Sequence, residues 1–544
     1  MHKKILLSSI LAFIFHTIII FFGVFPLSFD AYTHMFFASH YVNSWFNLWE
    51  PRWYGGFSIA SYTPLTHQIL ALFSLALKNY EYAYALLTLI LLTLTPIIVY
   101  SFTKNFFEEK VAVTSAIIAP FIPSIATTIY AYGQLPTLMS SLLTILGASF
   151  LHQYLKHHKK LNLLVAVLTT SSALTAHHLT SIFVLFLTLS TYIFNLKKDN
   201  IKTVTIKFLV FLALTSIITF AALHPFILFT LNFKGQAEIP HFSRDNIFFN
   251  IDYVTSIISM YSFTIFLLPQ IIYTAYKTKN IQPLLFVALI SLIFGFGGTT
   301  PIPKLVFQKY FETLIYDRFN YWTNLMLLPY ISILLVKLEE DGIKLKKFFK
   351  KLFIVGLIVS TIIISQSVVL LHFQPLSLDV EVDKAAEYLN NNNAEKWSYL
   401  TLGLCSYFDK FSLEVNSTTQ DGSYYIARTN PVLRESGIER IDGAKFFKNG
   451  IKVLRHFLFN ADKYHIRWVV CADRVYDKLL EEYGFKPSKT FGKIVIWEKP
   501  GVPPIKIQKK ELICYEWGII PPVILTLNLT LICYSYMRNR WSKS

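Results

Sequence analysis

The sequence predicts an α-helical polytopic membrane protein with about twelve transmembrane helices and a small extracytoplasmic α/β or α+β domain before the last helix. Composition is the first reason, because 53% of residues are hydrophobic and only 15% are charged, against about 25% in a soluble domain. The second is that the apolar residues form runs about as long as the roughly 20 residues needed to cross a bilayer. The third is a single long polar stretch, 372–516, which is large enough for one domain.

Twelve apolar runs are predicted to span the membrane. They are 5–27, 82–102, 111–129, 137–155, 161–176, 178–195, 206–229, 254–275, 281–297, 320–336, 351–371 and 517–537. The run 64–77 is apolar but short, so we expect it to lie along the interface or to re-enter. The chain therefore divides into a multi-pass region 1–371, a soluble domain 372–516, and a final helix with a basic tail, 517–544.

The lysines and arginines orient these spans, since loops on the cytoplasmic side carry the excess of both. With the N-terminus in the cytoplasm, every strongly basic loop falls inside: 104–110, 156–160, 197–207, 277–279, 337–351 and the tail 538–543. We therefore expect a cell-membrane protein with both termini in the cytoplasm, and with the first outer loop 27–81 and the soluble domain outside. The net charge of +17 is explained by topology and does not indicate a nucleic-acid partner.

The soluble domain shows alternating helix and strand patterns. A helix is expected at 382–390 and another at 474–484, with strands within 397–408, 466–472 and 493–499. Its Asn416-Ser417-Thr418 is a glycosylation sequon on the outside. Cys405 and Cys471 lie on the same side, so the sequence permits but does not establish a disulfide between them.

Asp30 is the first candidate for chemistry. It follows the first span directly, and His34 falls on the same face if 29–40 is helical. A carboxylate at a membrane boundary is costly unless it is paired or used, which makes Asp30 a functional candidate. The alternative is a solvated helix cap.

Arg52, Trp53 and Tyr54 form a second candidate group, beside the Gly55-Gly56 turn. A guanidinium with aromatic faces suits a sugar ring or a phosphate. An interfacial aromatic belt with a snorkelling arginine accounts for the same residues equally well.

His177 and His178 interrupt an apolar stretch at the outer face, where a neutral imidazole can donate to a phosphate. Polar capping of a broken helix is the more common reason for such a pair. Gln134, in the tight connection 132–136, is a weaker candidate for contact with substrate.

Arg318 lies where an outer loop enters a helix, after the glycine-rich stretch 295–303. A guanidinium in that position can bind phosphate oxygens in bidentate fashion. A structural pair with Asp317 is the alternative.

Nucleotide and metal motifs are absent from the sequence: it has no P-loop, no GxGxxG on a strand, no HExxH and no DxD. We expect no required cofactor and predict no metal ligands. A divalent metal stays open as an alternative, because ligands can converge from distant loops.

These stretches together resemble the GT-C superfamily of membrane glycosyltransferases, which use polyprenyl-phosphate sugars on the outer face. The resemblance rests on FDAYTHMFFA around Asp30, on WEPRWYGGFSIASYTPL, on the histidine pair, and on GFGGTTPIP with DRFNYW around Arg318. It is strongest to the prokaryotic multi-pass proteins labelled 6-pyruvoyl-tetrahydropterin synthase-related, and it covers the spans to about residue 340.

The resemblance implies roles for particular residues. The superfamily places an acidic residue in the first outer loop as catalytic base or metal ligand, a position that Asp30 occupies, and commonly an arginine on the lipid phosphate, for which Arg318 is the match. Two features depart from known members. Trp468 is followed by Val-Val-Cys where oligosaccharyltransferases have WWD, and Asp30-Ala31 stands where protein O-mannosyltransferases have Asp-Glu.

The expected reaction is an inverting transfer of one sugar from a polyprenyl-phosphate donor to a hydroxyl of a glycan, lipid or protein acceptor. Asp30 is expected to act as base and Arg318 to bind phosphate. The expected substrate-binding residues are His34, Arg52, Trp53, Tyr54, His177, His178 and Arg318. The alternative is a lipid or solute transporter or flippase, which also uses many spans but which the near absence of charges within the spans disfavours.

Overall fold

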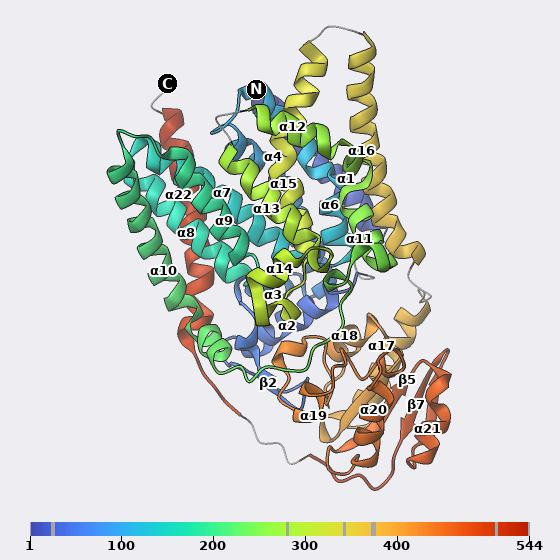
Figure 1. Cartoon of the computed structure of the whole chain (residues 1–544). Coiled ribbons are helices and arrows are strands. Elements are labelled where there is room, and N and C mark those ends of the chain that lie inside the picture. Colours follow the sequence, from blue (N-terminus) through green and yellow to red (C-terminus); the bar gives the residue numbers. More distant parts are fainter. Residues whose placement is uncertain are drawn as a thin grey trace.

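The computed structural model describes residues 2–22, 28–278, 282–340, 344–371, 377–505 and 510–541. A bundle of helices occupies the upper part of Figure 1, and a sheet domain (377–505) packs against its lower end, which we call the sheet-domain end. Helix α1 begins and α22 ends at the opposite end of the bundle. Parts of several predictions lie outside the described residues: the end of the first span and start of the outer loop (23–27), Lys279, 341–343, 372–376, 506–509 and 542–544.

Nine segments of the described chain are long and apolar enough to cross a membrane. Seven are continuous helices: α1 (His2–Phe21), α4 (Tyr80–Thr103), α7 (Leu135–His157), α10 (Ile201–Leu231), α15 (Asp317–Glu340), α16 (Lys344–Leu371) and α22 (Tyr515–Trp541). Two are broken: α5 (Glu109–Ile118) continues through η3 and α6 to η4 (Thr127–Ala131), and α11 (Ile251–Tyr261) continues through η7 to α12 (Leu268–Lys277).

Three further predicted spans form helices below the length of the other nine. They are α8 (Lys160–Ala176), α9 (Ser181–Asn195) and α13 (Gln282–Gly295). The multi-pass membrane fold is confirmed, whereas the count of twelve spans is not. The breaks have local causes, since Pro120 and Pro123 each start a new helical turn where a continuous helix would need their missing N–H.

The first outer loop of the prediction is an ordered unit at the sheet-domain end. It contains α2 (Ala31–Ser44), the two-stranded ladder of β1 (Trp49–Glu50) with β2 (Phe57–Ser58), and α3 (Leu65–Leu77). Helix α3 packs against α2, α4, α8 and α22. Its buried polar residues Thr66, His67 and Gln68 face protein, and Gln68 Nε2 donates to the carbonyl of Trp517 at 2.8 Å.

The sheet domain confirms the predicted mixture of helix and strand. Its sheet has the order β4-β3-β5-β7-β6, with β3 parallel to β4 and β5 and with β7 antiparallel to β5 and β6. The strands are β3 (Ser398–Leu402), β4 (Thr418–Thr419), β5 (Ile466–Cys471), β6 (Lys486–Phe491) and β7 (Ile494–Glu498), and the main helices are α17 (Ser377–Asn391), α18 (Tyr407–Glu414), α20 (Gly450–Phe459) and α21 (Asp477–Glu482). The strand expected within 397–408 is shorter than its pattern, because the chain turns at Gly403 and then forms α18. No disulfide joins Cys405 and Cys471 in the described chain.

The sheet domain is joined to the first outer loop by backbone hydrogen bonds. The amide of Thr419 donates to the carbonyl of Arg52 at 2.7 Å, and the amide of Gly55 donates to Thr419 at 2.9 Å. Gly55 and Gly56 have positive φ, which lets the chain turn at this contact. The Tyr424 hydroxyl adds a bond of 3.2 Å to the carbonyl of Ser61. The sheet domain thus fixes the conformation of the loop that follows Asp30.

Candidate functional site

Asp30 precedes α2 at its N-cap position, but its carboxylate makes no capping hydrogen bond. Instead Gln134 Nε2 donates to Asp30 Oδ2. The backbone of Asp30 is also held, because its amide donates to the carbonyl of Tyr132 at 3.2 Å. The half-buried carboxylate is therefore held in place by the connection 132–136, which the sequence predicted as a tight turn.

Gly133 makes this approach possible. It has φ of +68°, and a Cβ there would lie 2.5 Å from the amide nitrogen of Ala31 and 2.6 Å from Ser28 Oγ. Its carbonyl accepts a hydrogen bond of 2.8 Å from the Tyr84 hydroxyl. A larger residue would push the start of α2 away and move Asp30 with it.

Four histidines gather beside Asp30 around the ring of Tyr62. The centroid of Tyr62 lies 5.0 Å from those of His67 and His178 and 6.0 Å from those of His34 and His177. His34 Nδ1 and His67 Nε2 are 3.1 Å apart. Tyr424 closes the group from the sheet domain, with its ring 5.1 Å from Tyr62.

Several nitrogens of this cluster have no partner. His34 Nε2, His177 Nε2 and His178 Nδ1 are buried and make no hydrogen bond to any described residue. Burial, together with the neighbouring His67 and the charge of Arg318, lowers the pKa of His34 well below its usual value. Burial and the charge of Arg318 lower the pKa of His178 to about 3. Because these imidazoles are neutral at pH 7, each open nitrogen can donate or accept one hydrogen bond.

Arg318 completes the site from the start of α15. Its side chain is half-buried, and among the described residues it makes neither an ion pair nor a hydrogen bond. Burial raises the pKa of Asp30 to about 7, while the charge of Arg318 opposes that shift. Burial and then the charge of Arg318 lower the pKa of His177, whereas at Tyr62 burial raises the pKa and the charge of Arg318 opposes that rise. An unpaired cation here faces one carboxylate and several open imidazole nitrogens.

Arg52, Trp53 and Tyr54 differ from Arg318 because their side chains are bound or buried within the protein. Arg52 pairs with Glu50 through Nε at 2.7 Å and Nη2 at 2.8 Å, and its guanidinium lies 4.2 Å above the ring of Phe36. Trp53 is fully buried and stacks on Phe36 at 3.7 Å. Tyr54 is also buried against the sheet domain. This packing favours the structural alternative for the three, and their role in substrate binding stays a prediction.

Sequence reasoning missed several residues of the site. His67 was hidden in an apolar run, and Tyr62 and Tyr424 looked like ordinary aromatics. Gln134 was named, but only as a weaker candidate for contact with substrate. The sheet domain also brings Asp409, whose buried carboxylate accepts from Thr33 Oγ1 at 2.5 Å and from Ser423 Oγ at 2.6 Å. The polar cluster Thr66-His67-Gln68 was the one signal that could have marked α3 as protein-facing.

A groove of about 410 Å³ lies between α8, α9 and α10, and its lining includes Ser181, three residues after His178. Its walls are mostly apolar and include Leu174, Val184, Leu185 and Ile227. The neighbouring Phe226 ring lies 5.5 Å from that of His178. The Ser181 and Ile227 part of the groove therefore lies close in sequence to the His178–Phe226 contact.

A metal centre is not formed by the described residues, which contain no cluster of three or more His, Cys, Asp or Glu arranged to hold an ion. The four histidines surround an aromatic ring and do not converge on a common point. The metal requirement of the protein stays a prediction.

No family model matches the sequence, and no curated protein sequence matches it. Solved structures do. The apo oligosaccharyltransferase of Archaeoglobus fulgidus has a TM-score of 0.56 at 12% identity over 86% of this chain and 69% of that one. ArnT from Cupriavidus metallidurans bound to undecaprenyl phosphate has a TM-score of 0.55 at 9% identity, over 90% of this chain and 97% of ArnT. The mycobacterial arabinofuranosyltransferase AftD has a TM-score of 0.51 at 11% identity, over 92% of this chain and 40% of AftD.

Identities this low show the fold alone, and the fold is that of GT-C membrane glycosyltransferases. The predicted GT-C resemblance is confirmed at this level. The narrower 6-pyruvoyl-tetrahydropterin synthase-related family is not confirmed. The chain spans less than half of AftD, so no activity is carried over from that protein.

Proposed function

We propose that the protein is a membrane glycosyltransferase that moves a sugar from a polyprenyl-phosphate donor to an acceptor hydroxyl, with the site on the extracytoplasmic face. The observation that carries the proposal is the unpaired guanidinium of Arg318 beside open imidazole nitrogens and the half-buried Asp30. A half-buried cation and neutral donors suit a phosphate monoester or diester. A nearby carboxylate with a pKa of about 7 suits a general base.

The groove between α8, α9 and α10 supports a lipid-linked donor. An isoprenoid tail would bury its apolar surface there, where the groove walls are apolar. The phosphate would then lie near His178 and within reach of Arg318. ArnT, which shares the fold, is bound to undecaprenyl phosphate in its structure.

The reaction consists of one displacement. Asp30 takes the proton of the acceptor hydroxyl, and the acceptor oxygen forms a bond to the anomeric carbon. The bond from that carbon to the phosphate oxygen breaks, and its electron pair stays on the phosphate, where Arg318 and the imidazole N–H groups stabilise the charge. Attack opposite to the leaving phosphate inverts the anomeric configuration. A positioned base contributes roughly 10²–10⁴-fold to such a step.

The test uses full-length protein in nanodiscs with a panel of radiolabelled polyprenyl-phosphate sugars. Labelled sugar should move to an added acceptor fraction and release polyprenyl phosphate. An Asp30→Asn variant should bind donor normally and lose transfer. Full transfer by that variant would refute the base assignment.

The same preparation in sealed liposomes tests the transporter alternative. Uptake of a lipid or solute without any sugar transfer would replace the proposal. Transfer with no net uptake would support it.

A further inference from the structure

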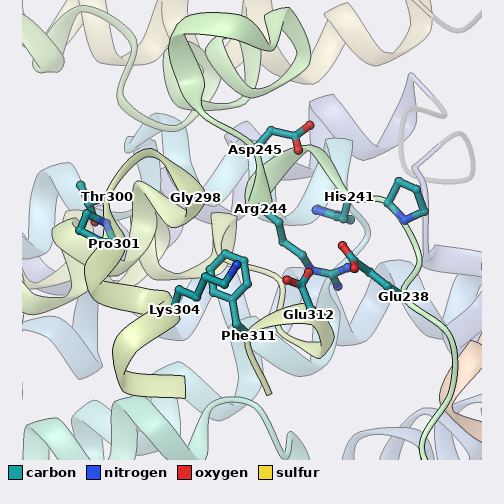
Figure 2. Close-up of a pocket in the computed structure, with 11 residues that line it drawn as sticks. Glu238, His241, Arg244, Asp245, Gly298, Thr300, Pro301, Lys304, Phe311 and Glu312 are labelled. Atoms are coloured by element: carbon teal, nitrogen blue, oxygen red, sulfur yellow. The ribbon is translucent and has the colours of Figure 1, made fainter. Parts of the chain in front are cut away.

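A second polar pocket lies at the sheet-domain end, beside the candidate site but distinct from it. The segments 238–245 and 298–312 enclose a cavity of about 300 Å³ between them (Figure 2). The backbone of Tyr316 links the pocket to Arg318, since its amide donates to Ser243 Oγ at 3.0 Å. Burial lowers the pKa of His241 in the pocket wall to about 3, and the charges of Arg244 and Arg318 add to that shift.

The glycine-rich stretch that the sequence singled out builds this pocket. A Cβ at Gly297 would collide with the carbonyl of Ser243, and one at Gly298 with that of Arg244. Two backbones therefore run in contact, and the side chains of both segments point into one space. The stretch has no other role in the proposed reaction.

The lining combines charges of both signs. Figure 2 shows Glu238, Arg244 and Glu312 pointing toward one another, with Lys304 beside the ring of Phe311. With Asp245, the pocket has three carboxylates against two cations. Such a near balance does not suit a multiply charged anion or a free cation.

The individual groups suit hydroxyls. Arg244 is oriented by donating to the carbonyl of Ile239 at 2.6 Å and to that of Leu314 at 3.1 Å, which leaves other N–H groups of the guanidinium open. The hydroxyl oxygen of Thr300 is buried and finds no hydrogen-bond partner among the described residues. Burial and the neighbouring carboxylate of Glu238 raise the pKa of Glu312. The set thus offers donors, acceptors and an aromatic wall.

We propose that this pocket binds one uncharged sugar residue, whose hydroxyls donate hydrogen bonds to the Glu238 and Glu312 carboxylates and accept hydrogen bonds from Arg244 and Lys304. This inference rests on the proposed function, because the sugar belongs either to the acceptor glycan or to the lipid-linked donor. The volume is at the lower bound of small-molecule sites, which begin at about 300 Å³.

Direct binding tests the pocket without turnover. Full-length protein in nanodiscs is titrated with a panel of methyl pyranosides and furanosides by saturation-transfer NMR. At least one glycoside should bind, and Glu312→Gln and Lys304→Met should each weaken it at least tenfold. Lys309→Met is the matched control, because Lys309 lies over Tyr310 on the same segment but outside the pocket. Absence of binding by every glycoside, or equal binding by the pocket variants, would overturn the proposal.

Lipid competitors identify the source of the sugar. Displacement of the glycoside by dolichyl-phosphate mannose but not by undecaprenyl phosphate assigns the pocket to the donor sugar. Retention of the glycoside with both lipids assigns it to the acceptor. Displacement by undecaprenyl phosphate alone would assign the pocket to phosphate and contradict the inference. Glycoside binding without any transfer activity would leave the pocket standing and refute only the transferase.

Discussion

Two arginines at the sheet-domain end are similar in sequence context and opposite in structure. Arg52 and Arg318 both lie within two residues of an acidic residue and among aromatic residues. Arg52 is bound by Glu50 on two nitrogens and covers Phe36. Arg318 makes no ion pair or hydrogen bond within the part of the chain that is described. Whether an arginine is structural or available to a ligand therefore depends on whether a carboxylate of the protein pairs with it, and not on the residue type.

The acidic neighbours explain the difference. Glu50 lies two residues before Arg52, on a strand that brings its carboxylate directly to the guanidinium, and His40 Nδ1 contacts the same carboxylate at 3.0 Å. Asp317 precedes Arg318 on a helix, where consecutive side chains diverge by about 100°. Asp317 Oδ1 is in fact buried without a hydrogen-bond partner among the described residues.

Arg52→Gln is expected to have the largest effect, and on stability. It leaves the carboxylate of Glu50, which is 2% exposed, without its cationic partner and with only His40 and the backbone amide of residue 52 as contacts among the described residues. Removal of one member of a buried pair costs about 3–5 kcal/mol. The apparent melting temperature in detergent should fall by several degrees. The double variant Glu50→Gln/Arg52→Gln should recover part of that loss. An unchanged melting temperature of the single variant would show that Arg52 is not structural and does not differ from Arg318 in this respect.

Arg318→Gln is expected to affect function and spare stability. Since the guanidinium has no partner among the residues that the structure describes, the melting temperature should stay within a degree or two. Transfer should fall by about 10²–10³-fold, as for loss of one preorganised charge donor. Undecaprenyl phosphate should also bind more weakly, measured by titration in nanodiscs. A stability loss equal to that of Arg52→Gln would show that Arg318 is structural too.

The pH dependence of transfer links Arg318 to Asp30. A base with a pKa of about 7 is protonated below that pH, so the rate should fall about tenfold per unit as pH decreases below 7. Arg318 lowers the pKa of Asp30, so the residual activity of Arg318→Gln should have its midpoint at higher pH. A midpoint near pH 4 in the wild type would place Asp30 in water and argue against its role as base.

Lysine replacements give the smallest effects and distinguish charge from geometry. Arg52→Lys loses the two-nitrogen contact and the stacking on Phe36, so its melting temperature should fall by less than in Arg52→Gln. Arg318→Lys keeps the charge, so transfer should fall about tenfold. Equal losses for lysine and glutamine at position 318 would indicate that a planar guanidinium is required.

Much of the fold could be predicted because apolar runs and basic loops are local signals. The sequence located α4, α7, α10 and α15 closely, and the strands β5 and β7 as well. It missed β4, which has two residues, and β6, whose exposed Lys486-Pro487 start has little of a strand pattern. The broken helices were also missed, since a helix that bends at Pro120 keeps its apolar composition.

The site was predicted only where one residue is costly by itself. Asp30, Arg318 and the His177-His178 pair stood out because charge and polarity are rare at a membrane boundary. His67, Tyr62 and Tyr424 have no such signal in the sequence. They can be recognised as site residues only in the structure, where α3 and the sheet domain bring them together. Arg52 was ambiguous for the same reason, since its sequence neighbours did not reveal that Glu50 would pair with it.

The hydrogen bond from Thr419 to Arg52 has a consequence for biosynthesis. The ribosome adds roughly 5–20 residues per second, so the loop after Asp30 leaves it about 20 to 70 s before its partner at Thr419 exists. During that interval Trp53 and Tyr54 have no sheet domain to pack against. A nascent chain stalled before α18 would be inserted in the membrane yet inactive, and its aromatic loop would be a natural target for quality control.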